Sequence, residues 1–382
     1  MPAPSDPDLY DRLKVRKLIN AHGTLTRLGG TLIAPRVMAA MQAASRHWID
    51  LPDLLARSGD YVAELLGVEA ALVTSGAAAG LALATAACVA GDDPALIQAL
   101  PHSLGDRYKV VIPKCHRNGY DQAVRQVGVE LVEFGWIKES APWQLEAALD
   151  AHTAAVVYFV EFAEVGGSLP LEQVIALAHQ RGVPVIVDAA AEIPPIGNLR
   201  RFRDMGADLV IFSGGKDIGG PQSSGLIVGR RDLIEQCQLH GSPNYSLGRS
   251  MKVGKEEIVG LVTALEDYLA QDEAAEMAQW EAQAAYLAST LNGVRGVCAR
   301  RVLLSGPGIR PITVPRAMVT WDAAVLGLTP AEVVRQLLAG EPGIVVGLEG
   351  AALLLNPQTL APGEEKIVAA RLAEVLGGAV SP

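Results

Sequence analysis

The chain of 382 residues has few cysteines and no excess of basic charge. Its four cysteines lie far apart without Cys-x-x-Cys spacing, so the sequence predicts neither a zinc site nor a disulfide framework. They are Cys88, Cys115, Cys237 and Cys298. The formal net charge is −10, whereas a nucleic-acid-binding surface needs clustered Lys and Arg to neutralise phosphates. We therefore expect no bound metal ion and no nucleic-acid partner.

Long apolar runs are also missing, with one apparent exception. The uncharged run from Ala71 to Ala90 is 20 residues long, which is the length of a membrane-spanning helix. It consists mostly of Ala, Gly, Ser and Thr, and we interpret it as a loop that leads into a buried helix. The first residues also lack the charged and apolar regions of a secretory signal. We expect a cytoplasmic protein with no membrane segment.

Half of the residues are hydrophobic (50 %), so a chain of this length can bury a large domain and a smaller one. From residue 109 onward, apolar strand-like runs alternate with helical patterns, which predicts a mostly parallel sheet with helices on both faces. The expected strands are 109–113, 129–134, 154–160, 183–188, 208–212 and 224–228. The fold class is therefore α/β.

The expected domain organisation has four parts. An amino-terminal segment, 1–45, contributes to the small domain, and 46–260 form the large domain. A long connecting helix covers 261–290. The remaining residues, 291–382, form a small α+β domain.

Two polar residues follow buried apolar strands in the second half of the large domain. Asp188 ends the run Pro184-Val185-Ile186-Val187, and Lys216 follows Phe212-Ser213-Gly214-Gly215. A lysine amine can form a Schiff base with the aldehyde of pyridoxal phosphate. An aspartate can hold the cofactor's pyridine nitrogen protonated, so that the ring accepts electrons. The pair therefore predicts a pyridoxal-phosphate site at the carboxyl ends of the strands.

A third element supports this interpretation. The stretch 73–80, Val-Thr-Ser-Gly-Ala-Ala-Ala-Gly, opens a helix of small residues. The first turn of a helix has free N–H groups and the positive end of the helix dipole, which together bind phosphate. An ordinary Ser or Thr N-cap is the alternative. A nucleotide-binding P-loop is disfavoured, because Val210 stands where that motif needs Gly and Asp217 where it needs Ser or Thr.

With these residues in view, the chain resembles the selenocysteine-synthase-like branch of fold-type I pyridoxal-phosphate enzymes. That branch includes L-seryl-tRNA(Sec) selenium transferase and D-glucosaminate-6-phosphate ammonia-lyase. Four stretches are similar to family motifs: 16–24, 114–121, 213–222 and 247–255. The lysine loop 213–222 is the most specific of them. The resemblance implies a seven-stranded, mostly parallel sheet, a smaller α+β domain and a homodimer.

The resemblance also implies roles for matching residues. Lys216 would carry the cofactor, Asp188 would pair with its ring nitrogen, and His116 would lie against the ring face. The phosphate would be held by Ser75, Gly76, Ala77 and Ser213. His116 and Ser213 keep structural alternatives, as a loop histidine and a strand-end cap.

Four basic residues are candidates for binding an anionic substrate group: Arg27, Arg249, Lys252 and Arg316. Arg249 and Lys252 lie in the fourth matching stretch, and both also fit as surface charges. The sequence leaves open which residue binds the substrate carboxylate.

The reaction expected from the resemblance is α,β-elimination from a small amino acid or amino-sugar acid, which releases ammonia and a 2-keto acid. The alternatives are β-replacement of the selenocysteine-synthase type and racemase, aldolase or aminotransferase chemistry. A non-catalytic scaffold is disfavoured by the intact pair of Asp188 and Lys216. Binding of seryl-tRNA is not expected, because the chain is acidic and only about 15 residues precede the Arg16 motif.

Overall fold

The computed structural model describes residues 8–377, which form two compact units. The large unit comprises Gly29–Gln271 and Ser305–Pro311, and the small unit comprises the residues up to Leu28, Asp272–Leu304 and those from Ile312 onward. Residues 29–45, expected in the small domain, belong to the large unit. The reason is that helix α2 (Pro35–Ala44) packs against α11 (Lys255–Ala270), where Arg36 pairs with Glu266 at 2.6 Å.

The large unit is built on a seven-stranded sheet with the strand order β2-β8-β7-β6-β5-β3-β4. Strand β8 is antiparallel to β2 and β7, and all other neighbouring pairs are parallel. The strands are β2 (Ala70–Thr74), β3 (Lys109–Pro113), β4 (Glu130–Phe134), β5 (Thr153–Phe159), β6 (Val185–Asp188), β7 (Leu209–Ser213) and β8 (Gly225–Gly229). The mostly parallel α/β sheet predicted from the sequence is confirmed.

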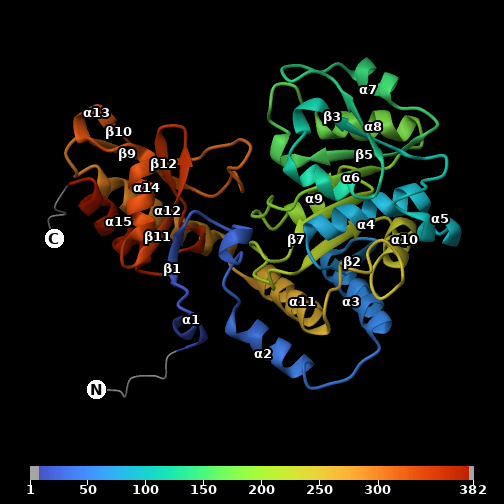
Figure 1. The fold of residues 1–382 in the computed structure, drawn as a ribbon, viewed down its shortest axis with the longest axis horizontal. Coiled ribbons are helices and arrows are strands. Elements are labelled where there is room, and N and C mark those ends of the chain that lie inside the picture. Colours follow the sequence, from blue (N-terminus) through green and yellow to red (C-terminus); the bar gives the residue numbers. More distant parts are fainter. Residues whose placement is uncertain (1–7, 378–382) are drawn as a thin grey trace. The chain divides into compact units, whose positions relative to one another are not determined.

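Helices cover both faces of this sheet (Figure 1). The Ala-rich helix α4 (Ala77–Ala90) crosses one face and contacts β5, β6, β7 and β8; its small side chains allow this close packing. The other α-helices are α3 (Leu51–Leu66), α5 (Pro94–Ala99), α6 (Gln122–Arg125), α7 (Pro142–Ala148), α8 (Leu171–Gln180), α9 (Asn198–Asp204) and α10 (Arg231–His240). Short 3₁₀ turns are η2 (Lys114–His116), η3 (Gly119–Asp121) and η4 (Val160–Phe162).

The central strands are apolar on both sides because both sheet faces are covered. Every residue of β5 is buried, from Thr153 to Phe159. Parallel strands with two buried faces carry continuous apolar runs instead of alternating, as residues 154–157 of β5 do. The parallel register places Asp188 beside Phe159 on one neighbouring strand and beside Ile211 on the other. The residues that follow β5, β6 and β7 therefore meet at one edge of the sheet.

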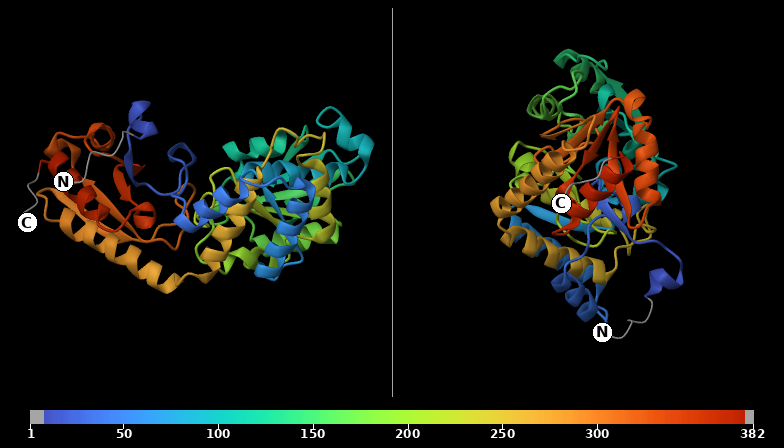
Figure 2. Two further views of the ribbon diagram at one scale, coloured as in Figure 1. Left: turned by 90° about the horizontal axis from the view of Figure 1, so that it is seen from below. Right: turned by 90° about the vertical axis from the view of Figure 1, so that its left-hand side faces the viewer.

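The small unit forms its own sheet with helices beside it (Figure 2). This sheet has five strands, and the unit has its own hydrophobic core. Its strand order is β1-β11-β12-β10-β9, and helices α12, α14 and α15 pack against the sheet and one another. The strands are β1 (Leu18–Ala21), β9 (Val297–Val302), β10 (Arg316–Trp321), β11 (Gly343–Glu349) and β12 (Ala352–Leu355). The helices are α1 (Leu9–Arg12), η1 (Thr26–Leu28), α12 (Glu273–Leu291), α13 (Ala323–Leu326), α14 (Pro330–Ala339), η5 (Pro357–Thr359) and α15 (Glu364–Val375).

The single connecting helix expected over 261–290 is in fact two helices. Helix α11 ends at Ala270 and α12 begins at Glu273. The break occurs because Asp272 caps the second helix: its carboxylate accepts hydrogen bonds from the N–H groups of Ala274 (3.1 Å) and Ala275 (3.0 Å). None of the helices described between residues 8 and 377 has the length and apolarity to span a bilayer.

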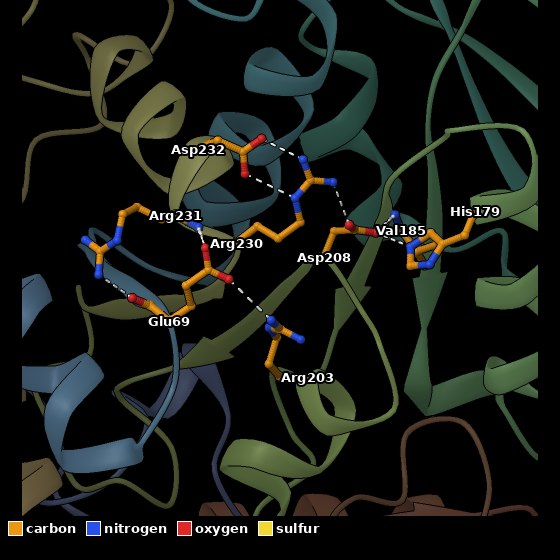
Figure 3. A network of polar contacts seen from close by, with 8 residues as sticks. All are labelled: Glu69, His179, Val185, Arg203, Asp208, Arg230, Arg231 and Asp232. Atoms are coloured by element: carbon orange, nitrogen blue, oxygen red, sulfur yellow. Dashed lines mark hydrogen bonds and ion pairs between the residues drawn. The ribbon is translucent and has the colours of Figure 1, made fainter.

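A buried carboxylate joins the amino ends of the central strands. Asp208 is 4 % exposed and accepts hydrogen bonds from three groups: His179 Nε2 (2.8 Å), Val185 N–H (2.8 Å) and Arg230 Nη1 (3.0 Å) (Figure 3). Arg230 also pairs with the exposed Asp232. Because Asp208 precedes β7, this network lies at the edge of the sheet opposite to Lys216.

We predict that Asp208→Asn lowers the free energy of unfolding by about 2 kcal/mol, because hydrogen bonds to a buried charge are lost or reversed. Asp232→Asn is the matched control, since it removes an exposed partner of the same arginine and should change stability by less than about 1 kcal/mol. Urea unfolding of both variants measures the difference. Equal losses in the two variants would contradict the importance of the buried carboxylate.

Candidate functional site

The lysine loop is held rigidly at the end of β7. After Ser213, the Gly214 N–H donates to Ser224 O at 2.9 Å, and the Gly219 N–H donates to Lys216 O at 3.0 Å. Gly215 permits the close approach of the returning chain, because a Cβ there would lie 2.5 Å from Gln222 Cα. The turn after the strand therefore holds the backbone of Lys216 in place.

Charges around Lys216 oppose the effect of its burial. Burial lowers the pKa of the Lys216 amine, whereas the carboxylates of Asp188, Glu161 and Glu192 each raise it. A lowered pKa makes the neutral, nucleophilic amine more accessible at neutral pH. The sheet edge thus combines one lysine with three acidic side chains.

Asp188 ends β6 with only part of its charge compensated. Its Oδ1 accepts a hydrogen bond from the Ala190 N–H at 2.9 Å. Burial raises the pKa of Asp188 to about 6; Ala190 and Lys216 oppose this rise, and Glu161 and Glu192 add to it. A buried carboxylate with a raised pKa is stabilised when a cation binds next to it. The site therefore fits a protonated pyridine nitrogen at Asp188.

The loop before α4 has the features of a phosphate cradle. Thr74 Oγ1 donates to Gly76 O at 3.0 Å, and Ser75 Oγ donates to Met251 O at 3.2 Å. The loop packs directly on β8: a Cβ on Gly225 would lie 2.5 Å from the carbonyl carbon of Gly76. The 14-residue helix that follows offers the free N–H groups of its first turn. Ser75, Gly76 and Ala77 are therefore placed to hold a phosphate, and this role stays a prediction.

His116 is more enclosed than expected. Its side chain is fully buried, its Nε2 lies 2.8 Å from Ser168 Oγ, and its Nδ1 accepts from the Phe159 N–H at 3.2 Å. This pairing places the ring proton on Nε2, and burial lowers the pKa of His116 to about 3. The rings of Tyr158 and Phe162 lie next to it, with centroids at 4.5 and 6.0 Å. Contact of His116 with the cofactor ring stays a prediction.

Four further residues were not expected from the sequence: Tyr120, Glu161, Glu192 and Arg310. Burial is the main cause that raises the pKa of Tyr120, and the carboxylates of Glu161 and Asp188 raise it further. The phenol therefore lies near the same edge of the sheet. Glu161 follows β5 as Asp188 ends β6, and this strand-end position was a usable sequence signal. Arg310 had no such signal, because it comes from a distant stretch of the chain.

The basic candidates divide between the two units. In the large unit, Arg249 lies over the Tyr245 ring at 5.9 Å. Its segment reaches the cradle, because the hydrogen bond from Ser75 goes to Met251, next to Lys252. In the small unit, burial is the main cause that lowers the pKa of His22, and the charges of Arg27 and Arg316 lower it further. Substrate binding stays a prediction for all four residues, which are Arg249, Lys252, Arg27 and Arg316.

The amino-terminal motif forms a fixed turn in the small unit. Asn20 Oδ1 accepts hydrogen bonds from the N–H groups of His22 (3.0 Å) and Gly23 (3.3 Å), and its Nδ2 donates to Gly23 O at 2.8 Å. The Asn356 N–H donates to Ala21 O at 2.8 Å. The Asn side chain therefore determines the path of the chain that carries His22 and leads to Arg27.

Comparison with known proteins gives consistent matches. A family model described as L-seryl-tRNA selenium transferase matches residues 18–281. The chain is 36 % identical to a 5'-C-glycyluridine monooxygenase-decarboxylase from Streptomyces sp, over 97 % of this chain and 93 % of that protein. It is 34 % identical to a D-glucosaminate-6-phosphate ammonia lyase from Salmonella typhimurium (97 % and 98 %). It is 28 % identical to the L-seryl-tRNA(Sec) selenium transferase of Moorella thermoacetica (97 % and 83 %).

Solved structures agree with these matches. A structure of D-glucosaminate-6-phosphate ammonia-lyase has a TM-score of 0.83 at 34 % identity and covers 97 % of this chain and 99 % of that chain. Serine palmitoyltransferase from S. paucimobilis, with a bound PLP-myriocin aldimine, has a TM-score of 0.59 at 15 % identity (94 % and 88 %). At that identity the likeness establishes the fold alone.

We predict that Lys216→Ala abolishes covalent attachment of pyridoxal phosphate and leaves the fold intact. The reason is that Lys216 follows β7, whose neighbouring strand β6 ends in Asp188, and that the charges of the two residues interact. Borohydride reduction followed by peptide mapping should label Lys216 in the unchanged protein. A label on any other lysine would refute the assignment.

Asp188→Asn should retain the cofactor but slow α-proton exchange of a bound amino acid on the order of 10²-fold, because the ring nitrogen loses its charge partner. NMR in D₂O measures this exchange. Asp208→Asn is the control, since it changes a buried aspartate at the opposite edge and should leave the rate per folded molecule unchanged. An unaltered rate in Asp188→Asn would rule out the proposed role.

Proposed function

Because this chain belongs to the L-seryl-tRNA selenium transferase family, whose model matches residues 18–281, we propose that it catalyses α,β-elimination on a small amino acid or amino-sugar acid. The chain is a pyridoxal-phosphate-dependent enzyme, as its sequence predicted. The observation that carries the proposal is the arrangement of Asp188 and Lys216 at adjacent strand ends. Similarity to an ammonia lyase over 97 % of the chain supports elimination as the reaction.

The residues of the large unit fit the steps of this reaction. When bound, pyridoxal phosphate supplies an aldehyde that captures the substrate amine and a ring that accepts electrons from the α-carbon. Lys216 Nζ, whose pKa is lowered by burial, removes the α-proton. Asp188 would stabilise a proton on the ring nitrogen, and the first turn of α4 would hold the phosphate. The leaving group would depart from the β-carbon with its electron pair. The Lys216 amine would then displace the product nitrogen, and water would hydrolyse the released enamine to ammonia and a 2-keto acid.

A screen of hydroxy-, phospho- and sugar-derived amino acids tests the proposal. D-Glucosaminate 6-phosphate, D-serine and L-serine are the first compounds to include. We expect one of them to give equal amounts of ammonia and 2-keto acid, at the same rate under nitrogen as under air. Incorporation of an added thiol or selenide at the β-carbon, without net ammonia release, would favour β-replacement instead.

A second reaction is favoured by one specific observation, the 36 % identity to a monooxygenase-decarboxylase. A reaction of that kind consumes dioxygen and releases carbon dioxide. The same screen separates it from elimination, because its product would form only under air and with measurable oxygen uptake. Oxygen-dependent carbon dioxide release in place of ammonia would replace the elimination proposal.

The proposed assembly is a homodimer in the cytoplasm, with a free small molecule as substrate. Its support is the set of exposed aromatic side chains on the large unit, which includes Trp48 (100 % exposed) and Tyr245 (89 %). The net charge of −10 disfavours binding of tRNA. Sedimentation at micromolar concentration tests the dimer, and a filter assay with seryl-tRNA tests nucleic-acid binding.

A further inference from the structure

A short stretch of the chain is anchored on the active-site edge of the large unit. Residues Ser305–Pro311, here called the strap, belong to the large unit, although Leu304 and Ile312 on either side belong to the small one. The Gly308 N–H donates to Glu161 Oε1 at 2.5 Å. Arg310 Nη2 donates to Val160 O at 3.0 Å. The strap is thus bound to the chain that follows β5.

Its strongest anchor is a buried ion pair. Arg310 Nε lies 2.8 Å from Glu192 Oε1, and Nη2 lies 2.6 Å from Oε2, which is a bidentate geometry. The two side chains are only 5 % and 7 % exposed. Removing one member of such a pair leaves the other charge buried without its partner. The charges of Arg310 and Glu192 therefore depend on each other.

The Arg310–Glu192 ion pair lies close enough to the candidate cofactor site to interact with its charged groups. Burial raises the pKa of Glu192, and Arg310 and Lys216 oppose that rise. The Glu192 carboxylate in turn acts on both Lys216 and Asp188. The charged and titratable groups that meet here are Tyr120, Glu161, Asp188, Glu192, Lys216 and Arg310. Arg310 supplies positive charge that offsets the carboxylate closest to it.

We propose that Arg310 is a positioning residue for the reaction: through Glu192 it fixes the strap on the sheet edge and sets the net charge around Lys216. This inference rests on the proposed function only in taking Lys216 as the attachment point of the cofactor. It goes beyond that function, because it assigns a role to Arg310 through its contacts with Glu192 and Val160.

A role in charge balance and a role in anchoring predict different directions for the change in pKa of the nitrogen at Lys216. Glu192→Gln leaves the Arg310 cation without its partner, which disfavours a proton on the nitrogen at Lys216. Arg310→Gln leaves the Glu192 carboxylate, which favours that proton. Anchoring alone predicts that both changes loosen the strap and act in the same direction. Opposite shifts therefore identify charge balance.

The experiment is a pH titration of the visible absorbance of the cofactor bound at Lys216, with no substrate added. We expect the midpoint to fall by roughly one pH unit in Glu192→Gln and to rise by a similar amount in Arg310→Gln. The double variant should return to within about 0.3 units of the unchanged protein, since both charges are gone. Lost packing alone would not give opposite shifts of the midpoint in the single variants that cancel in the double variant.

Two control variants keep the test decisive. Arg310→Lys retains the charge but loses the bidentate fork, so its midpoint should stay near that of the unchanged protein even if its stability falls. Arg36→Gln removes an arginine paired with Glu266 on α11 and should not move the midpoint. If Arg310→Gln fails to fold, the direction of the shift in Glu192→Gln and the retained midpoint in Arg310→Lys still decide the question.

The outcomes separate this inference from the proposed function. Equal directions in the two single variants, or unchanged midpoints, would overturn charge balance while leaving the elimination proposal intact. Absence of any cofactor band at Lys216 would overturn both. A failed substrate screen together with opposite shifts would overturn elimination alone.

Discussion

The parallel register of β5, β6 and β7 is the constraint on which the site depends. Parallel strands end at one edge, so groups far apart in sequence become neighbours there. Asp188 pairs in register with Phe159 and Ile211, and Glu161 and Lys216 follow those neighbouring strands. Since the strands are buried on both faces, the polar groups have nowhere to lie except beyond the strand ends.

Burial then makes these groups depend on one another. In water these charges would interact weakly. At a buried, desolvated sheet edge, each charge changes the pKa of its neighbours. The pKa of Asp188 rises to about 6 by burial even with Lys216 nearby. The site is thus prepared for an added cation at Asp188, and the strap reaches it with a cation of its own, Arg310.

Much of the fold was predictable because local patterns carry it. The alternation of apolar strands with helices predicted the sheet, and the run of small residues predicted α4, which packs tightly for that reason. The boundaries of the two units were less accessible. The membership of α2 depends on its packing against α11, and the break between α11 and α12 on a cap by Asp272, both of which are decided by specific contacts.

The sequence by itself determined the cofactor and the family, because Asp188 and Lys216 follow strands whose ends must coincide and the motifs around them are distinctive. Only the tertiary structure decided how this pair is surrounded. It enclosed His116 completely and brought in Glu192 and Arg310 from separate segments. The physical reason is that strand periodicity is a local property of the chain, whereas burial and charge neighbours arise from contacts between residues more than a hundred positions apart.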